Sequence, residues 1–417
     1  MRSFHVPDFY HSPIISRVKH LRKAQDPRKQ DFTPSILDFG SVRFILARHF
    51  GFCYGVENAI EIAYQAIEEN QGKRIFLLSE MIHNPEVNSD LSSRGVGFLM
   101  DTEGQVMTPF DQLTSEDVVL IPAFGTTLEM EQQLQAIGLD VERYNTTCPF
   151  VEKVWKRAAK LAMEKYTIII HGKPEHEETR ATFSHAQEKG HAVVILNMAE
   201  AEILSDFISG QRPLDTFDAT FGQRCTPGFD PNVHLKSVGV VNQTTMLASE
   251  TKAISHRIRK AIESREKGQF ANTRDTLCYA TNDNQQATMG ALEAREADLA
   301  VVVGGYNSSN TSHLVELCEE NLPTFFVRNE LEFHSDGTLN HFDWRTGLHQ
   351  STMSPWPETG RSGVPTILIT SGASCPDASV DRVMKEVIGQ YANTRIVDEV
   401  LKEFEQRLAL NQSSSEG

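Results

Sequence analysis

Short apolar runs alternate with helical periodicity along most of the chain from residue 42 onward. The apolar runs are uninterrupted, which is typical of strands covered on both faces of a parallel sheet. Between them, apolar residues recur at intervals of three and four, as in 150–164 and 248–264, which predicts helices. The order strand, helix, strand favours an α/β fold. The expected strands are 43–47, 75–78, 117–123, 167–170, 192–196, 237–241, 299–303 and 366–370.

Three segments show no clear periodicity of apolar and polar residues. Residues 1–41 mix basic residues with prolines, and we interpret them as an extension or peripheral arm. A transit peptide is poor in acidic residues, whereas this segment contains several aspartates. Residues 209–236 and 332–363 are expected to be long loops because they carry dense turn signals.

Composition narrows the class of protein. A chain of 417 residues is expected to form two or three domains. Its net charge of −16 argues against a nucleic-acid-binding surface, and no run approaches the roughly 18–20 apolar residues that a membrane span requires. The six cysteines form no C-x-x-C pair, which favours a reducing compartment. We expect a cytoplasmic protein, or one of the plastid stroma if residues 1–41 are a transit peptide.

Three cysteines occupy one kind of position. Cys53, Cys148 and Cys278 each follow a strand or extended stretch and precede a helical pattern. A helix N-terminus favours a thiolate, because its N–H groups and dipole stabilise negative charge. If the three corners converge, their sulfurs suit a soft metal, and the lack of an obvious fourth ligand suggests an iron–sulfur cluster with one open iron. The alternatives are buried structural thiols or a zinc site, which normally has four ligands.

The remaining cysteines lie in other settings. Cys318 falls on the face of a helical pattern and is expected in the core, and Cys225 lies in a loop. Cys375 follows the turn "TSGAS", and we assign it no role.

Two further corners favour anion binding. In "VVVGGYNSSNTSHL", Ser308, Ser309 and Asn310 follow a strand and a glycine pair and open a helix. In "TSGASCPD", Ser374 lies in a similar turn before another helical pattern. Such positions present hydroxyl, amide and backbone donors to a phosphate. The alternative is helix capping alone, which serine and asparagine commonly provide.

Polar groups also gather where other expected strands end. His83 follows one strand, His176 and Glu177 follow another, and Thr244 lies in "NQTTM" after a third. Ligands of α/β sheets collect at the carboxyl ends of strands, so these side chains are candidates for substrate contact and proton transfer. A lone histidine at such a point is also commonly a cap or a surface residue.

Eight ordered motifs resemble one known family. They are "GFCYGV", "IHNPEVN", "TTCPFVEKVW", "HEET", "NQTTM", "LCYAT", "NSSNTSHL" and "TSGASCPD". Spread over about residues 43–391, they resemble the 4-hydroxy-3-methylbut-2-enyl diphosphate reductases, the LytB/IspH family. The resemblance implies an iron–sulfur oxidoreductase that catalyses the last step of the methylerythritol phosphate route to isoprenoids. The implied reaction reductively removes the substrate hydroxyl and gives isopentenyl and dimethylallyl diphosphates.

The resemblance also implies the cofactor and the fold. The family binds a 4Fe–4S cluster through three cysteines, which by motif are Cys53, Cys148 and Cys278, and the substrate hydroxyl meets the fourth iron. The implied fold is three α/β lobes with mostly parallel sheets, arranged pseudo-threefold around this cluster, with the N-terminal strand packed into the third lobe. The expected segments are 1–41 as extension, 42–53 as that strand, 54–147, 148–274 and 275–391 as lobes, and 392–417 as C-terminal helix and tail.

Individual residues take roles from the same motifs. Glu177 would supply the proton relay, Thr244 would position the substrate hydroxyl, and His176 would assist both catalysis and binding. The residues implied to hold the diphosphate are His83, His176, Ser308, Asn310 and Ser374, and the loop pattern adds Ser309.

The chain departs from many bacterial members at two points. Phe124 stands where those members have the histidine of an "AHG" motif, which leaves one diphosphate contact unassigned. They read H-P-E-V-E-G-T where this chain reads "KPEHEET", so alignment by the proline selects Glu175 and alignment by "HEET" selects Glu177. Phe124 and "HEET" resemble the plant and cyanobacterial branch, and we therefore prefer Glu177.

Two other functions compete with the reductase. A non-catalytic iron–sulfur carrier has no need of diphosphate loops, and a zinc- or cysteine-dependent hydrolase needs a fourth ligand or a histidine-activated thiol. The chain carries no flavin or nicotinamide fingerprint, so a reductase would take electrons from a donor such as ferredoxin or flavodoxin. The sequence leaves the oligomeric state open.

Overall fold

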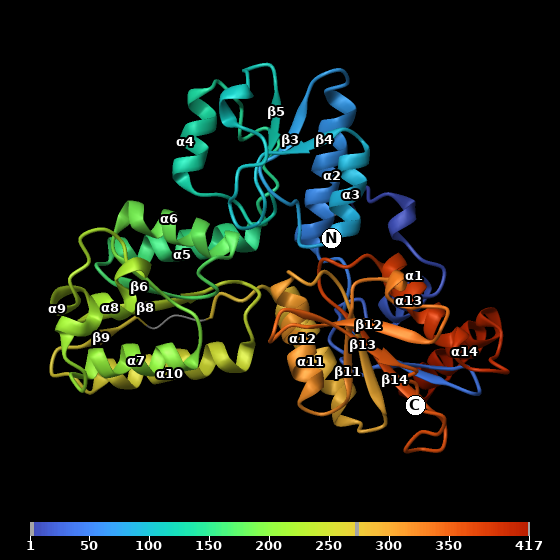
Figure 1. The fold of residues 1–417 in the computed structure, drawn as a ribbon. Coiled ribbons are helices and arrows are strands. Elements are labelled where there is room, and N and C mark those ends of the chain that lie inside the picture. Colours follow the sequence, from blue (N-terminus) through green and yellow to red (C-terminus); the bar gives the residue numbers. More distant parts are fainter. Residues whose placement is uncertain (1–3, 272–274, 416–417) are drawn as a thin grey trace. The chain divides into compact units, whose positions relative to one another are not determined.

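The computed structural model describes residues 4–271 and 275–415 (Figure 1). The chain forms two compact units, each built from more than one stretch of sequence. Unit 1 comprises Met1–Tyr54, His83–Pro85 and Tyr279–Gly417, and unit 2 comprises Gly55–Ile82 and Glu86–Cys278.

Unit 1 contains a five-stranded sheet in the order β1-β2-β14-β10-β11. β2 pairs in parallel with β14, β14 with β10 and β10 with β11, and only β1 runs antiparallel to its neighbour. A separate antiparallel hairpin joins β12 to β13. The strands are β1 (Ser35–Asp38), β2 (Arg43–Leu46), β10 (Leu299–Val303), β11 (Thr324–Val327), β12 (Thr338–Asp343), β13 (Leu348–Met353) and β14 (Thr366–Ser371).

Helices of unit 1 flank the five-stranded sheet, and the first and last of them lie at opposite ends of the sequence (Figure 1). α1 nevertheless contacts both α13 and α14. The helices are η1 (Asp8–Tyr10), α1 (Ile15–Gln25), α11 (Tyr279–Glu293), α12 (Ser309–Glu319), η5 (Glu330–Glu332), α13 (Asp377–Gly389) and α14 (Val397–Ser415).

The segment before residue 42, where the sequence has no clear period, contributes to the core of unit 1. Ile15 and Val18 of α1 are buried with Leu37 of β1 and with residues of β14 and α13. The core contacts of α1 rest on few apolar residues, so tertiary packing rather than amphipathic periodicity stabilises this helix.

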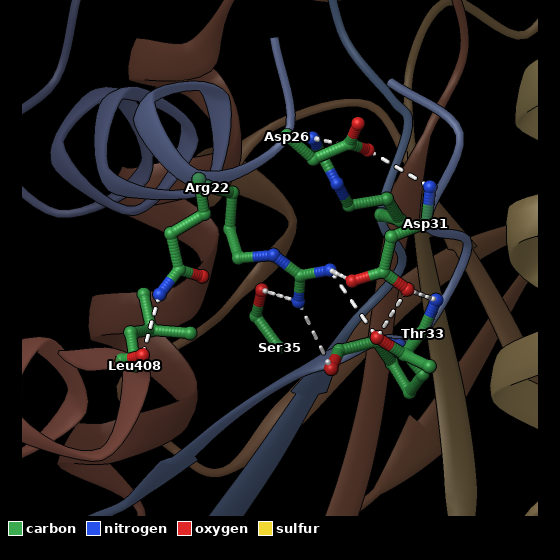
Figure 2. Close-up of polar contacts among 9 residues, drawn as sticks. Arg22, Asp26, Asp31, Thr33, Ser35 and Leu408 are labelled. Carbon is green, nitrogen blue, oxygen red and sulfur yellow. Dashed lines mark hydrogen bonds and ion pairs between the residues drawn. The ribbon is translucent and has the colours of Figure 1, made fainter. Parts of the chain in front are cut away.

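Arg22 of α1 holds the connection to β1 in place (Figure 2). Its guanidinium donates to Asp31 Oδ2 at 2.7 Å, to the hydroxyls of Thr33 and Ser35 at 3.3 Å each, and to the carbonyl of Pro34 at 3.4 Å. Burial lowers the pKa of Arg22, and the charge of Asp31 opposes that effect. The side chain is 5% exposed, so its charge is stabilised by these acceptors rather than by water.

We expect Arg22→Met to destabilise unit 1 by about 2–4 kcal/mol, because the substitution leaves a charged acceptor and several polar groups without their donor. Urea unfolding followed by circular dichroism measures this effect. Arg28→Met, at an exposed position in the same connection, is the control and should change stability little. An unfolding midpoint for Arg22→Met equal to that of the control would contradict the assigned role.

Unit 2 contains two parallel sheets, with strand orders β4-β3-β5 and β7-β6-β8-β9. Their strands are β3 (Ile75–Leu77), β4 (Val96–Phe98), β5 (Val118–Leu120), β6 (Thr167–His171), β7 (Ala192–Ile195), β8 (Ser237–Asn242) and β9 (Gln269–Phe270). The helices of unit 2 are α2 (Tyr54–Glu69), α3 (Pro85–Ser93), η2 (Phe110–Gln112), α4 (Leu128–Ala136), α5 (Pro149–Met163), α6 (Glu177–Lys189), α7 (Met198–Ser209), η3 (Leu214–Thr216), α8 (Phe217–Phe221), η4 (Gly222–Arg224), α9 (Pro231–His234) and α10 (Ala248–Glu263). The first residues of α2 and α3 belong to unit 1.

The predicted α/β class with mostly parallel sheets is confirmed, and each expected strand is present. The two expected loops contain regular structure: 209–236 includes short helices, and 332–363 includes the β12–β13 hairpin. β13 is largely exposed, so it lacks the continuous apolar run that identified the central strands. The pseudo-threefold arrangement and the lobe boundaries remain predictions. Within the described residues, no helix has the length and hydropathy needed to cross a membrane.

Candidate active site

The loop after β10 forms a buried polar corner in unit 1. Ser308 is the N-cap of α12: its hydroxyl accepts from the Thr311 N–H at 3.3 Å and from the Thr311 hydroxyl at 2.9 Å. Ser309 and Asn310 follow it in the first turn of the helix, and both are almost fully buried. The sequence therefore places three polar side chains where the N–H groups of a helix are directed outward.

A second loop, between β14 and α13, packs directly against the first. The Ala373 N–H donates to Asn310 Oδ1 at 2.8 Å, and the Ser374 hydroxyl donates to the His83 carbonyl at 3.2 Å. Gly305 permits this close approach, because a Cβ there would lie 2.4 Å from the His83 carbonyl oxygen. Unit 1 thus brings together His83, Ser308, Ser309, Asn310 and Ser374, the predicted diphosphate-binding residues other than His176.

Two donors in this corner have no acceptor among the residues that the structure describes. Among the described residues, the Ser309 hydroxyl and the Asn310 amide nitrogen make no hydrogen bond, although both are buried. A buried donor without an acceptor costs about 1–3 kcal/mol. An anion with several oxygens at the α12 N-terminus would satisfy both donors, so the corner fits a phosphate or diphosphate.

Cys53 lies beside this corner. The Cys53 N–H donates to the Ala373 carbonyl at 3.2 Å, and Ala373 in turn donates to Asn310. α2 begins at Tyr54, so the cysteine immediately precedes a helix, as predicted. Unit 1 therefore carries one of the three predicted cluster ligands next to the candidate diphosphate loops.

Unit 2 carries the other two cysteines, and each also immediately precedes a helix. Cys148 is the N-cap of α5, and the Val151 N–H donates to its carbonyl at 2.9 Å. The backbone N–H groups of Phe150 and Val151 act to lower the pKa of its thiol. Burial nevertheless raises the pKa of Cys148 to about 11, and the charges of Cys278 and Glu178 act in the same direction. Cys148 and Cys278 therefore belong to the same unit, and their thiols interact electrostatically.

The "NQTT" segment, which begins at the last residue of β8, positions Cys278. The Cys278 N–H donates to the Thr244 carbonyl at 3.2 Å. Slightly earlier, the Thr276 N–H donates to Asn242 Oδ1 at 3.0 Å, and the Thr276 hydroxyl donates to the Asn242 carbonyl at 2.8 Å. Thr244 and Cys278 are thus held together by their backbones.

Glu178, which the sequence analysis did not select, is the carboxylate that contacts Thr244. Its Oε1 accepts from the Thr244 N–H at 2.6 Å, and its Oε2 accepts from the Thr244 hydroxyl at 2.9 Å. Glu178 is 1% exposed, and burial raises its pKa to about 7 against the lowering effect of these hydrogen bonds. A carboxyl group with this pKa can both hold and release a proton near neutrality.

Glu177 and Glu175 have different surroundings. The Glu177 carboxylate accepts a hydrogen bond from the Ser79 hydroxyl and lines a pocket of about 200 Å³ together with Thr126 and Arg180. Glu175 is exposed. Neighbouring residues in a helix point about 100° apart, so the "HEET" motif alone could not indicate which glutamate faces Thr244.

His176 caps α6 in a way that defines its protonation. Its Nδ1 accepts from the Glu178 N–H at 3.1 Å, so a neutral His176 carries its proton on Nε2, where it is a donor. Phe124, at the position of the histidine in many bacterial members, packs edge-on against the His176 ring at 5.4 Å between centroids. Phe124 therefore supports His176 and does not itself supply a hydrogen bond.

The remaining cysteines are placed differently. Cys318, expected in the core, is fully buried on α12, which confirms that prediction. Cys375 is also fully buried and belongs to the core of unit 1. Cys225 is partly exposed between η4 and α9.

The ligand set for a metal is incomplete within either unit. Over the described residues, no group of three or more histidine, cysteine, aspartate or glutamate side chains gathers as a metal site. Unit 2 supplies two neighbouring thiols at helix N-termini, and unit 1 supplies Cys53 in the same local setting. Sulfur donors of this kind suit iron, so the donor chemistry fits an iron–sulfur cluster.

Curated relatives share most of the chain. A protein named 4-hydroxy-3-methylbut-2-enyl diphosphate reductase from Synechococcus sp. (strain WH7803) is 39% identical over 84% of this chain and 86% of its own. A relative of the same name from Synechococcus sp. (strain ATCC 27144 / PCC 6301 / SAUG 1402/1) is 38% identical over 93% of this chain and 97% of its own.

Solved structures and a family profile agree with these relatives. The E-1-hydroxy-2-methyl-but-2-enyl-4-diphosphate reductase from Plasmodium falciparum superposes with a TM-score of 0.61 at 19% identity, covering 87% of this chain and 98% of the other. An (E)-4-hydroxy-3-methyl-but-2-enyl diphosphate reductase structure has a TM-score of 0.50 at 23% identity, covering 83% and 99%. These structures support the fold. The family described as LytB protein matches residues 44–388, and the chain belongs to that family.

Proposed function

We propose that the protein reduces (E)-4-hydroxy-3-methylbut-2-enyl diphosphate to isopentenyl and dimethylallyl diphosphates, the last step of the methylerythritol phosphate route to isoprenoids. The relatives named as this reductase support the reaction. The single observation that carries the proposal is the Cys148–Cys278 pair beside Glu178 and Thr244, because it joins candidate cluster ligands to a proton donor. In the overall change, two electrons and two protons convert the substrate hydroxyl to water and leave a C–H bond in its place.

The diphosphate would bind to unit 1. The Ser309 hydroxyl and the Asn310 amide would donate to its oxygens, which would satisfy both unpartnered donors. Ser308, Ser374 and His83 surround the same corner and would complete its polar lining. Several converging donors favour an anion that has more oxygens than a single carboxylate offers.

The proton would come from Glu178 through Thr244. The two side chains already share a hydrogen bond of 2.9 Å, so a protonated Glu178 can donate to the Thr244 oxygen while the Thr244 hydroxyl donates to the departing hydroxyl of the substrate. The Thr244 N–H then stabilises the carboxylate that remains. We therefore assign to Glu178 the role that the motif alone suggested for Glu177.

Cys53, Cys148 and Cys278 would hold a 4Fe–4S cluster. When bound, the cluster supplies the electrons and the Lewis acidity needed to cleave the carbon–oxygen bond. Cys148 immediately precedes α5, whose first N–H groups favour its thiolate and offset part of the cost of burying it. An external donor such as ferredoxin or flavodoxin would deliver the electrons.

An anaerobic assay tests this proposal. The purified protein should be brown, and it should oxidise a reduced viologen dye only after the hydroxylated diphosphate is added. A brown protein that leaves the dye reduced would be an electron carrier, and a colourless protein that hydrolyses the diphosphate would be a zinc or cysteine hydrolase. Either result would refute the proposed reaction.

The pKa of Glu178, raised to about 7, predicts a pH dependence of turnover. The reaction requires the protonated carboxyl, so kcat should be highest below pH 7 and fall by about tenfold per pH unit well above it. The pH profile of kcat at saturating substrate and dye measures this limb. In the Glu178→Gln protein, the residual kcat should no longer fall above pH 7. If kcat of that variant still falls as it does in the wild type, the pH dependence belongs to another group.

A further inference from the structure

The loop before Cys53 is held by the N-terminal segment of the chain. Lys19 of α1 donates from Nζ to the Phe50 carbonyl at 2.7 Å and lies 4.3 Å from the centre of the Phe50 ring. Tyr10 packs edge-on against Phe52, with ring centres 5.6 Å apart. These contacts come from α1 and η1 and reach the residues immediately before Cys53.

Lys19 also connects this loop to the start of α13. Its Nζ donates to Asp377 Oδ1 at 2.5 Å, and Ser16 of α1 donates to the other carboxylate oxygen at 3.2 Å. Asp377 is the first residue of α13 and follows the loop that carries Ser374. The ammonium group of Lys19 therefore connects the Cys53 loop, residues 47–53, to the end of the Ser374 loop, residues 372–376.

The geometry around Gly51 indicates that this bridge is tightly packed. Gly51 has a φ of +77°, and a Cβ there would lie 2.6 Å from Lys19 Nζ and 2.8 Å from Asp377 Oδ1. The Lys19 and Asp377 side chains are only 28% and 15% exposed. Arg17, also on α1, pairs with Glu405 of α14, and those side chains are 45% and 51% exposed. The Lys19 pair is better shielded from water and should contribute more than an exposed pair does.

We propose that Lys19 is a positioning residue, which fixes the Cys53 loop against the Ser374 loop through its simultaneous bonds to Phe50 and Asp377. The inference rests on the proposed function, in which Cys53 is a cluster ligand. The N-terminal segment then has a specific task, because it holds a ligand loop that contains Gly51, a residue with little conformational restriction of its own.

Hydrogen exchange measured by mass spectrometry on the anaerobically purified protein tests this directly. In Lys19→Met, the amides of residues 49–54 should exchange about fivefold faster or more. An increase of this size is expected when the loop loses a charge-assisted hydrogen bond that opposes its local opening. Peptides from β10 and β14 should exchange as in the wild type. Arg17→Met is the matched control, because it removes a cation from the same helix without affecting the loop, and it should match the wild type throughout.

A second readout follows the cofactor. The visible absorbance of Lys19→Met should decay about fivefold faster or more in the presence of an iron chelator, whereas Arg17→Met should decay at the wild-type rate. Asp377→Asn, which keeps the size of the side chain, is the second variant if Lys19→Met fails to fold, and it should produce the same two changes. Unchanged exchange at 49–54 in these variants, or an equal increase in Arg17→Met, would overturn the positioning role.

The two proposals fail in different ways. A wild-type protein that carries no cluster would refute the proposed cofactor, and the exchange comparison would still decide whether Lys19 fixes the loop. A brown, active wild type with unchanged exchange in the variants would refute only the role of Lys19.

Discussion

Replacing Glu178 with glutamine should lower kcat by about 10²–10⁴-fold, the range typical of a lost general acid. Glutamine keeps the shape of the side chain and can still accept from the Thr244 N–H, but it cannot supply a proton. Visible absorbance and iron content should stay at wild-type levels, because the Glu178 carboxylate is not a proposed ligand. Anaerobic dye oxidation measures the rate, and competition with a non-reactive diphosphate measures substrate binding, which should change little.

The neighbouring glutamate supplies the matched control. Glu177→Gln makes the same chemical change one residue earlier, and its side chain bonds to Ser79 instead of Thr244. We expect Glu177→Gln to retain kcat within a few-fold. Loss of turnover in Glu177→Gln with a normal rate in Glu178→Gln would return the proton-donor role to the residue that the motif first suggested. Glu175→Gln, at an exposed position, should also be close to wild type.

Replacing Cys148 with serine should reduce cluster content to below about a tenth of the wild-type level, because serine offers a poor ligand to a soft metal site. Iron and acid-labile sulfide content, together with visible absorbance, measure the loss. The same result is expected for Cys278→Ser and for Cys53→Ser, which removes the ligand supplied by unit 1. Turnover should fall in parallel.

Cys225→Ser is the control for these substitutions. Cys225 is partly exposed, as Cys148 is, and it precedes no candidate site, so its replacement should leave the cluster intact. Equal cluster content in Cys225→Ser and Cys148→Ser would contradict the ligand assignment. Cys318 is a less suitable control, because a serine hydroxyl in its fully buried position would itself destabilise the protein.

Continuous apolar runs made the central strands predictable from sequence. β10 and β14 are buried along their whole length, so their apolar runs stand out in the sequence. The corners after such strands were predictable for the same reason, and the polar residues after β10 do open α12. Two kinds of element were not predictable from the sequence. α1 contacts α13 and α14, which lie far from it in the chain. The β12–β13 hairpin has no continuous apolar face that would identify its strands.

Side-chain direction was the part of the candidate site that the sequence could not provide. "HEET" places two adjacent glutamates at the start of α6, and only the folded helix separates the one that contacts Thr244 from the one that contacts Ser79. The role of Lys19 was hidden in a similar way, because its partners Phe50 and Asp377 lie far from it in sequence. Nothing in the local pattern around Lys19 indicates these contacts.

Product analysis tests the central claim most directly. The wild-type protein, purified without oxygen and supplied with reduced viologen and (E)-4-hydroxy-3-methylbut-2-enyl diphosphate, should convert the substrate to isopentenyl and dimethylallyl diphosphates, identified by mass spectrometry and chromatography. Intact substrate recovered from a brown protein, or release of inorganic phosphate in place of the two diphosphate products, would contradict the proposed reductive removal of the hydroxyl.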